Sequence, residues 1–285
     1  MGAVPRRKSR RDQSSSRLRR CHSHNLVGYT YGNLLVHYLK CYRQPWLGSY
    51  RFMIEERHLE EYKNHGFTIV ENYITPKELK IAQWETLKLK RWYLIHKMDG
   101  KPRDVGTGRY WRGLERAGDM SPKLMELYTS KKQYDTATKF LETDEIYFFN
   151  DEIVAKYPNE EFEFMIHTDN EWGPDPEAAA RGDYKLVNIN WILDDMTSNN
   201  GPISFRTKKK FFAPRPKAGD AVIFDGNTVH WSTKNNSKKV RRCWATQYTT
   251  KSIGHFFNND KHPLPQFKGF YTERFNVSQL PSSQI

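Results

Sequence analysis

Cysteines are few in this chain and long apolar runs are missing, and both shortages narrow what the protein can be. The three cysteines, Cys21, Cys41 and Cys243, form no zinc-type pair and cannot all pair with one another. Neither a disulfide framework nor a cysteine-based metal site is therefore predicted. No apolar stretch approaches the roughly 20 residues that a membrane-spanning helix needs. We expect a soluble intracellular protein in a reducing compartment, with no membrane partner.

Acidic residues are scarce at the start of the chain. Residues 1–20 hold eight Lys or Arg side chains and one acid, Asp12, so more than half of the formal net charge of +13 lies there. This Arg- and Ser-rich composition is typical of a targeting segment, a disordered basic arm or a nuclear signal, and the choice stays open. We expect residues 1–48 to be a basic extension and residues 49–285 to be the functional domain. The location is then cytoplasmic, or plastid, mitochondrial or peroxisomal if the extension is a targeting segment.

The remaining 265 residues carry only a mild positive charge, which does not require a nucleic-acid partner. Hydrophobic residues make up 37% of the chain and aromatic residues 14%, enough to build a core. Glu55 to Asn64 is predicted to be a helix that ends at Gly66, and Phe67 to Val70 a strand. Thr75-Pro-Lys-Glu78 supplies an N-cap, a proline at the first helical position and an acid three residues later, which predicts a helix running toward Arg91.

From Glu145 onward the pattern changes to short β-prone runs separated by Gly, Pro, Asn and Asp. These runs are Ile146–Asn150, Glu161–Asp169, Leu186–Leu193, Pro202–Phe205, Ala221–Asp225 and Val240–Thr249. Several short strands with turn signals between them favour a β-sandwich or barrel over a parallel α/β sheet. We therefore predict a mainly β fold with flanking helices.

One of these runs carries a candidate metal-binding pair. The two-residue period of a strand over Glu161–Asp169 places Met165, His167 and Asp169 on one face. A neutral imidazole and a carboxylate on one face suit a divalent metal, although a third ligand must come from elsewhere. His-x-acid pairs also arise by chance, and we assign no role to His58-Leu-Glu60, which is expected on a helix surface.

A second cluster strengthens the metal hypothesis. A Gly-Asp turn leads into the apolar run Ala221–Asp225, a loop then delivers His230, and a further strand carries Arg241. The sequence here resembles the phytanoyl-CoA dioxygenase-like branch of the iron(II)- and 2-oxoglutarate-dependent dioxygenases. That family has His-x-Asp, a distant His about sixty residues later and an Arg eleven residues after that His. The intervals in this chain are 63 residues from His167 to His230 and 11 from His230 to Arg241.

The resemblance spans roughly residues 50 to 250. Further matching segments are Glu60–Ile74, Leu193–Asp195, Asn200–Pro202, and Ser232 with Asn235. One segment departs from the family: a Pro-Gly-Ser-His turn usually follows the proline, whereas this chain has Ser204–Lys210. Because that segment borders the active-site mouth in the family, the identity of the substrate cannot be carried over.

The resemblance implies a double-stranded β-helix core of the jelly-roll, cupin-like type. It implies that His167, Asp169 and His230 bind Fe(II), and that 2-oxoglutarate and O2 are cosubstrates. It also assigns the far carboxylate of 2-oxoglutarate to Arg241, whose guanidinium can form two parallel hydrogen bonds with it, and allows Ser232 to add another. Arg242 is expected on the opposite face of the strand.

Four further residues are candidates on weaker grounds. Asn188 and Asn190 share one face of a predicted strand and Trp191 lies on the other, where core packing is expected. If the asparagines face the barrel, they are candidates to hold the cosubstrate or to orient a ligand. Arg109 and Arg112 lie in a stretch of glycines and aromatics that either binds the carboxylates or phosphates of a substrate or is a solvated basic loop.

These features predict an oxygenase that oxidises a C–H bond of an anionic small molecule. Hydroxylation or oxidative cyclisation of an acyl-CoA or a carboxylated specialised metabolite would be coupled to conversion of 2-oxoglutarate to succinate. Two alternatives stay open: an oxygenase that modifies nucleic acid or protein, with the basic extension as docking element, and an inactive barrel that only binds. The presence of all three ligands and the arginine disfavours the last. The sequence leaves the substrate and the oligomeric state open.

Overall fold

The computed structural model describes residues 54–96, 113–115, 117–159, 161–172, 175–207, 210–251, 253 and 273–275. Within these ranges the chain forms two antiparallel sheets with helices against the larger one. Among the described helices, none is long and apolar enough to cross a lipid bilayer.

Local signals set the first three elements as the sequence predicts. Helix α2 (Glu56–His65) ends at Gly66, whose φ of 82° is a left-handed conformation that glycine adopts without strain. Strand β1 (Phe67–Val70) follows directly. Thr75 and Glu78 form reciprocal hydrogen bonds of a capping box at the start of α3 (Pro76–His96). The helix runs one turn beyond the expected end at Arg91.

The larger sheet has the strand order β1-β8-β5-β10-β3-β11, and β2 also pairs with β3. Its strands after β1 are β2 (Gly113–Glu115), β3 (Ile146–Lys156), β5 (Leu186–Ile192), β8 (Ala221–Asp225), β10 (Arg241–Thr249) and β11 (Glu273–Phe275). The smaller sheet has the order β4-β9-β6-β7. Its strands are β4 (Phe164–His167), β6 (Ile203–Arg206), β7 (Phe211–Phe212) and β9 (His230–Ser232). This is the predicted jelly-roll arrangement.

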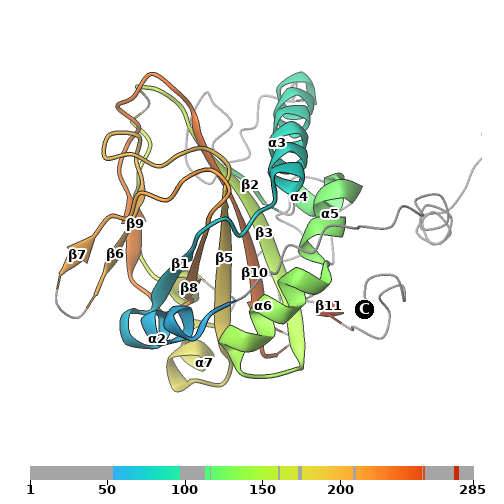
Figure 1. The fold of residues 1–285 in the computed structure, drawn as a ribbon, viewed down its shortest axis with the longest axis vertical. Helices are drawn as coiled ribbons and strands as arrows, with labels where there is room; N and C mark the ends of the chain where they lie inside the picture. The colour runs from blue at the N-terminus through green and yellow to red at the C-terminus, as the bar shows by residue number, and fades with distance from the viewer. Residues whose placement is uncertain are drawn as a thin grey trace, which may run out of the picture. The chain divides into compact units, whose positions relative to one another are not determined.

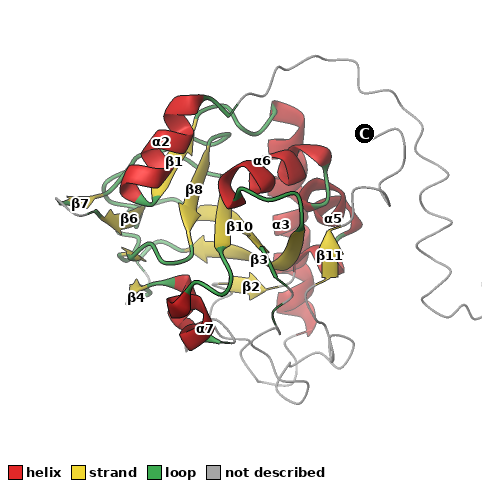
Figure 2. Cartoon of the chain, turned by 90° about the horizontal axis from the view of Figure 1, so that it is seen from below, coloured by secondary structure: helices red, strands yellow, loops and turns green. Residues whose placement is uncertain are grey.

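Helices α3, α5 and α6 lie on one side of the larger sheet and the smaller sheet lies on the other (Figure 1, Figure 2). Figure 1 shows α3, α5 and α6 on one side of the central strands and β6, β7 and β9 on the other, and Figure 2 agrees. The remaining helices are α4 (Ala117–Met120), α5 (Pro122–Tyr128), α6 (Lys131–Leu141), α7 (Pro176–Arg181) and the 3-10 turn η3 (Asp169–Trp172). The larger sheet is therefore covered on both faces.

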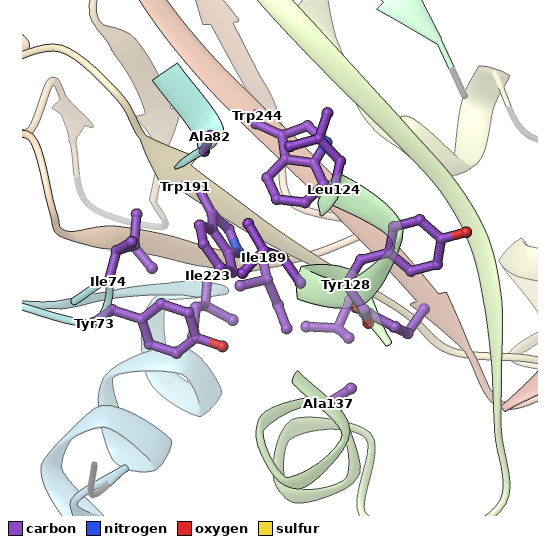
Figure 3. Packing of buried hydrophobic residues seen from close by; sticks show 14 of the residues in the cluster. Tyr73, Ile74, Ala82, Leu124, Tyr128, Ala137, Ile189, Trp191, Ile223 and Trp244 are labelled. Carbon is purple, nitrogen blue, oxygen red and sulfur yellow. The ribbon is translucent and has the colours of Figure 1, made fainter. Parts of the chain in front are cut away.

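The helix-facing side of the larger sheet forms the main hydrophobic core. Ile189 and Trp191 of β5 and Trp244 of β10 pack there against Leu124 of α5 and Ala137 of α6, as Figure 3 shows. The rings of Trp191 and Trp244 lie 5.1 Å apart, centre to centre. Burying a side chain of this size contributes about 1.5–3 kcal/mol. The prediction that Trp191 packs in the core is confirmed.

The opposite side of the same strands faces the smaller sheet. Ile192, Val222, Phe224 and Cys243 pack there with Phe205 of β6 as a second, smaller cluster. Because successive strand residues point to opposite faces, each long strand contributes to both layers. The predicted site residues that the structure describes lie on this side of the larger sheet.

The core on the helix side should dominate stability. We expect Leu124→Ala, at a fully buried position, to lower the free energy of unfolding by about 2–5 kcal/mol, because it removes apolar contacts and leaves a cavity. The matched change Leu87→Ala, at a position 49% exposed on α3, should have a much smaller effect. Urea denaturation followed by circular dichroism measures both. Equal losses would contradict the assignment of the core.

Candidate functional site

Three side chains from separate elements meet between the sheets. His167 ends β4, Asp169 begins η3 and His230 begins β9. One ligand atom from each lies within 4.8 Å of the others, and within the described residues this is the one such group of His, Cys, Asp or Glu. Asp169 Oδ1 lies 3.6 Å from His167 Nε2 and 3.5 Å from His230 Nε2.

Strand pairing closes the long sequence gap between the two histidines. Strands β4 and β9 are antiparallel neighbours, and His167 lies directly opposite His230 in their register. Side chains of directly opposed residues lie on the same face of a sheet. The two rings are accordingly 4.3 Å apart, centre to centre.

The predicted strand geometry around Asp169 is wrong. The regular period required Met165, His167 and Asp169 on one face, but the strand ends at His167 and its register shifts between Phe164 and His167. Met165 and Ile166 are exposed as a result, and such irregularities commonly re-aim side chains beside active sites. Asp169 instead reaches the histidines from the 3-10 turn.

A capping box holds that turn. Glu171 N donates to Thr168 Oγ1 at 3.2 Å, and Thr168 N donates to Glu171 Oε2 at 3.0 Å. The Thr-x-x-Glu pattern is a known signal for the start of a helical turn, and it is visible in the sequence. It was the signal that could have placed Asp169 outside the strand.

Backbone carbonyls orient both rings. The Nδ1 of His167 is 2.6 Å from the Met165 carbonyl oxygen, and the Nδ1 of His230 is 2.9 Å from that of Thr228. Since a carbonyl oxygen only accepts, each Nδ1 carries the proton. Each Nε2 then presents a lone pair toward the centre of the group, as a metal-binding histidine requires.

Two amide side chains hold the second oxygen of Asp169. Asn188 Nδ2 donates to Asp169 Oδ2 at 2.5 Å, and Gln247 Nε2 donates to the same oxygen at 3.2 Å. Gln247 Nε2 also donates to Asn188 Oδ1 at 2.8 Å. In the structure Asn188 therefore hydrogen-bonds to Asp169, a candidate metal ligand. Sequence reasoning missed Gln247, although the two-residue period from Arg241 along β10 puts it on the same face.

Burial and hydrogen bonding shift the pKa values of all three groups. Burial would raise the pKa of Asp169, but the two imidazoles and the Asn188 amide outweigh it and lower that pKa. Burial lowers the pKa of His230. Burial also opposes protonation of His167, but its hydrogen bonds to Asp169 and the Met165 carbonyl prevail and raise the pKa. Two imidazoles and an ionised carboxylate fit the facial set found in non-haem iron sites.

Arg241 lies on the same face of β10 as Gln247 but at the opposite end of the strand. Its side chain is 98% buried, its Nη2 donates to the Gly201 carbonyl oxygen, and its Nη1 is 3.5 Å from Cys243 Sγ. Its Nε is buried without a hydrogen-bond partner among the described residues. A buried donor without an acceptor is costly, and the carboxylate of a dicarboxylic cosubstrate would satisfy it. Arg242 faces the other way, as expected, and the structure pairs it with Asp194 at 2.7 Å.

Of the four remaining candidate residues, the structure describes two. Ser232 is buried and lies opposite both Phe164 and Ile203 in the smaller sheet. Asn190 is buried on the inner face and lies opposite Ala245. Arg109 and Arg112 lie outside the described residues.

Comparison with known proteins agrees with this geometry. The family model for phytanoyl-CoA dioxygenase (PhyH) matches residues 206–243, which include His230 and Arg241. The resemblance to the phytanoyl-CoA dioxygenase family is confirmed. That family model describes a dioxygenase, which agrees with the predicted class of enzyme, and the meeting of His167, Asp169 and His230 agrees with the predicted binding of iron. No curated protein matches this phytanoyl-CoA dioxygenase-like chain significantly.

Solved structures share the fold at low sequence identity. EctD from S. alaskensis, in its apoform, is 19% identical, with a TM-score of 0.59 over 68% of this chain and 76% of its own. SnoK, a non-heme alpha ketoglutarate dependent carbocyclase from nogalamycin biosynthesis, is 15% identical, with a TM-score of 0.58 over 71% and 86%. SnoN, an epimerase from the same biosynthesis, is 17% identical, with a TM-score of 0.58 over 74% and 90%.

The amides beside Asp169 give this phytanoyl-CoA dioxygenase-like site a direct test. We expect Asn188→Leu to weaken Mn2+ binding about tenfold or more, because losing a partner of a ligand typically costs 10–100-fold in metal affinity. Titration of Mn2+ followed by electron paramagnetic resonance measures the affinity. Asn199→Leu, in an exposed turn, is the matched control and should leave the affinity unchanged. An unaltered affinity in Asn188→Leu would show that this amide does not hold the ligand.

Proposed function

We propose that this chain oxidises a C–H bond of an anionic small molecule by hydroxylation or oxidative cyclisation. The reaction would convert 2-oxoglutarate to succinate and carbon dioxide. The observation that carries the proposal is the meeting of His167, Asp169 and His230 within 4.8 Å, on the side of the larger sheet that also carries the buried Arg241.

Iron(II) bound with 2-oxoglutarate and O2 supplies an oxidant strong enough to attack an unactivated C–H bond. Three protein ligands on one side of the metal leave positions for both cosubstrates. The residues of the chain bind and orient. His167 and His230 would offer Nε2, and Asp169 would offer Oδ1 while Asn188 and Gln247 fix its other oxygen. Arg241 would hold the far carboxylate of 2-oxoglutarate through its unused Nε.

The proposal of a small substrate has separate support. EctD from S. alaskensis has been solved with 2-oxoglutarate and 5-hydroxyectoine, and SnoN in complex with Fe3+, alpha ketoglutarate and nogalamycin RO. Both relatives bind small molecules. The anionic class rests on the sequence, through Arg109 and Arg112, and takes in an acyl-CoA or a carboxylated specialised metabolite.

Anaerobic titration with Fe(II) and 2-oxoglutarate tests the proposal. We expect the wild-type protein to develop the weak visible absorption band of an iron-bound 2-oxo acid. His167→Ala should lose the band because the iron would then lack one of its three protein ligands. His65→Ala, at an exposed position on α2, is the control and should keep it. Lack of the band in folded wild-type protein would overturn the proposal.

The class of substrate is tested after admission of O2. Acyl-CoA thioesters and carboxylated metabolites are supplied in turn, and succinate and oxidised product are measured by mass spectrometry. We expect one of these anionic classes to raise succinate formation in step with product. Stimulation by polynucleotides or proteins alone would favour the other kind of oxygenase.

A further inference from the structure

Gln247 lies in a row of three amide side chains beside the proposed metal site. Strand β10 sets it directly opposite Asn188 of β5 on one side and directly opposite Asn150 of β3 on the other. Directly opposed side chains leave the same face of a sheet and lie close enough to interact. Gln247 is therefore within reach of both neighbours, and the partners that it binds indicate its role.

The side-chain nitrogen of Gln247 serves the metal site alone. Its Nε2 donates to Asn188 Oδ1 at 2.8 Å and to Asp169 Oδ2 at 3.2 Å, which uses both protons of the amide. Asn150 is only 8% exposed, and its Oδ1 is buried without a hydrogen-bond partner among the described residues. A buried acceptor without a donor is costly. An amide that leaves this acceptor unpaired to supply two bonds on the other side indicates a function at the metal site rather than packing.

The chemistry of the carboxylate fixes the orientation of the neighbouring amide. An ionised carboxylate only accepts hydrogen bonds, so Asn188 must turn its Nδ2 toward Asp169 Oδ2, to which it donates at 2.5 Å. The Oδ1 of Asn188 then faces Gln247 and accepts from it. Gln247 thus holds Asp169 Oδ2 in two ways, directly through its own N–H and indirectly by fixing the rotation of Asn188.

The two oxygens of Asp169 consequently have different surroundings. Oδ1 lies 3.6 Å from His167 Nε2 and 3.5 Å from His230 Nε2, whereas Oδ2 accepts from the two amides. A carboxylate can bind a divalent cation through one oxygen or through both. Turning Oδ2 toward an ion at the histidines would break both amide hydrogen bonds. The amides therefore favour binding through Oδ1 alone.

We propose that Gln247 is a positioning residue that keeps Asp169 bound to the metal through one oxygen and so leaves a further coordination position open for the cosubstrates. This inference rests on the proposed function. The role needs no contact between Gln247 and the metal or 2-oxoglutarate, because the residue acts through Asn188 and Asp169.

The number of water molecules bound to Mn2+ measures the open positions without any catalysis. Water enriched in the magnetic isotope of oxygen broadens the electron paramagnetic resonance lines of protein-bound Mn2+ according to the number of waters on the ion. We expect Gln247→Leu in the full-length protein to show about one bound water fewer than the wild type, because the freed Oδ2 of Asp169 takes a position on the metal. Gln247→Glu keeps the shape of the side chain but replaces the N–H donors with an oxygen that repels Oδ2, and it should show the same decrease.

Gln83→Leu is the matched control. Gln83 is a half-buried glutamine of α3 that donates to the Leu193 carbonyl oxygen at 2.7 Å, so its loss should leave the number of bound waters unchanged. An unchanged number in either folded Gln247 variant would overturn the inference. Weaker Mn2+ binding without that change would indicate a purely structural role. The glutamate variant decides the matter if the leucine variant fails to fold. Wild-type protein that binds no Mn2+ would overturn the proposed function itself.

Discussion

The pairing of β4 with β9 is the constraint on which the site depends. It sets His167 opposite His230 across 63 residues of chain, and it leaves Asp169 only the length of one turn in which to join them. Backbone carbonyls on each side of the pair fix both imidazoles by Nδ1, so the strands position the rings and select the nitrogen that faces inward. A slip of one residue between these strands would turn one histidine out of the site.

One face of the larger sheet forms the main hydrophobic core, and the other face carries residues of the site. Every residue of β5 is buried, yet Ile189 and Trp191 pack against the helices while Asn188 and Asn190 face the smaller sheet. Burial of the apolar face stabilises the fold and offsets the free-energy cost of burying polar groups on the other face. On that face amides and a carboxylate gather at one end and a buried arginine lies at the other, so the site is polarised along the strands.

Features that neighbouring residues determine can be predicted from the sequence, whereas features that depend on contacts between distant residues cannot. Capping residues and a C-terminal glycine predict α2 and the start of α3 nearly to the residue, and alternation predicts which faces Trp191 and Arg242 take. His58 is different. Expected on a helix surface, it is buried, and its Nδ1 accepts from Glu55 N in the capping of α2, an interaction that helical spacing alone does not reveal.

The segment that departs from the family pattern still supports His230, by packing rather than by motif. Phe205 of β6 pairs with His230 in register and is fully buried. Its ring stacks on Phe67 at 4.2 Å and lies 5.4 Å from Phe224, which itself is 4.7 Å from the His230 ring. These contacts confine the imidazole laterally while Thr228 fixes its rotation. The aromatic rings thus form a wall beside the imidazole, while the neighbouring β7 edge is open to solvent, where Phe211 is exposed.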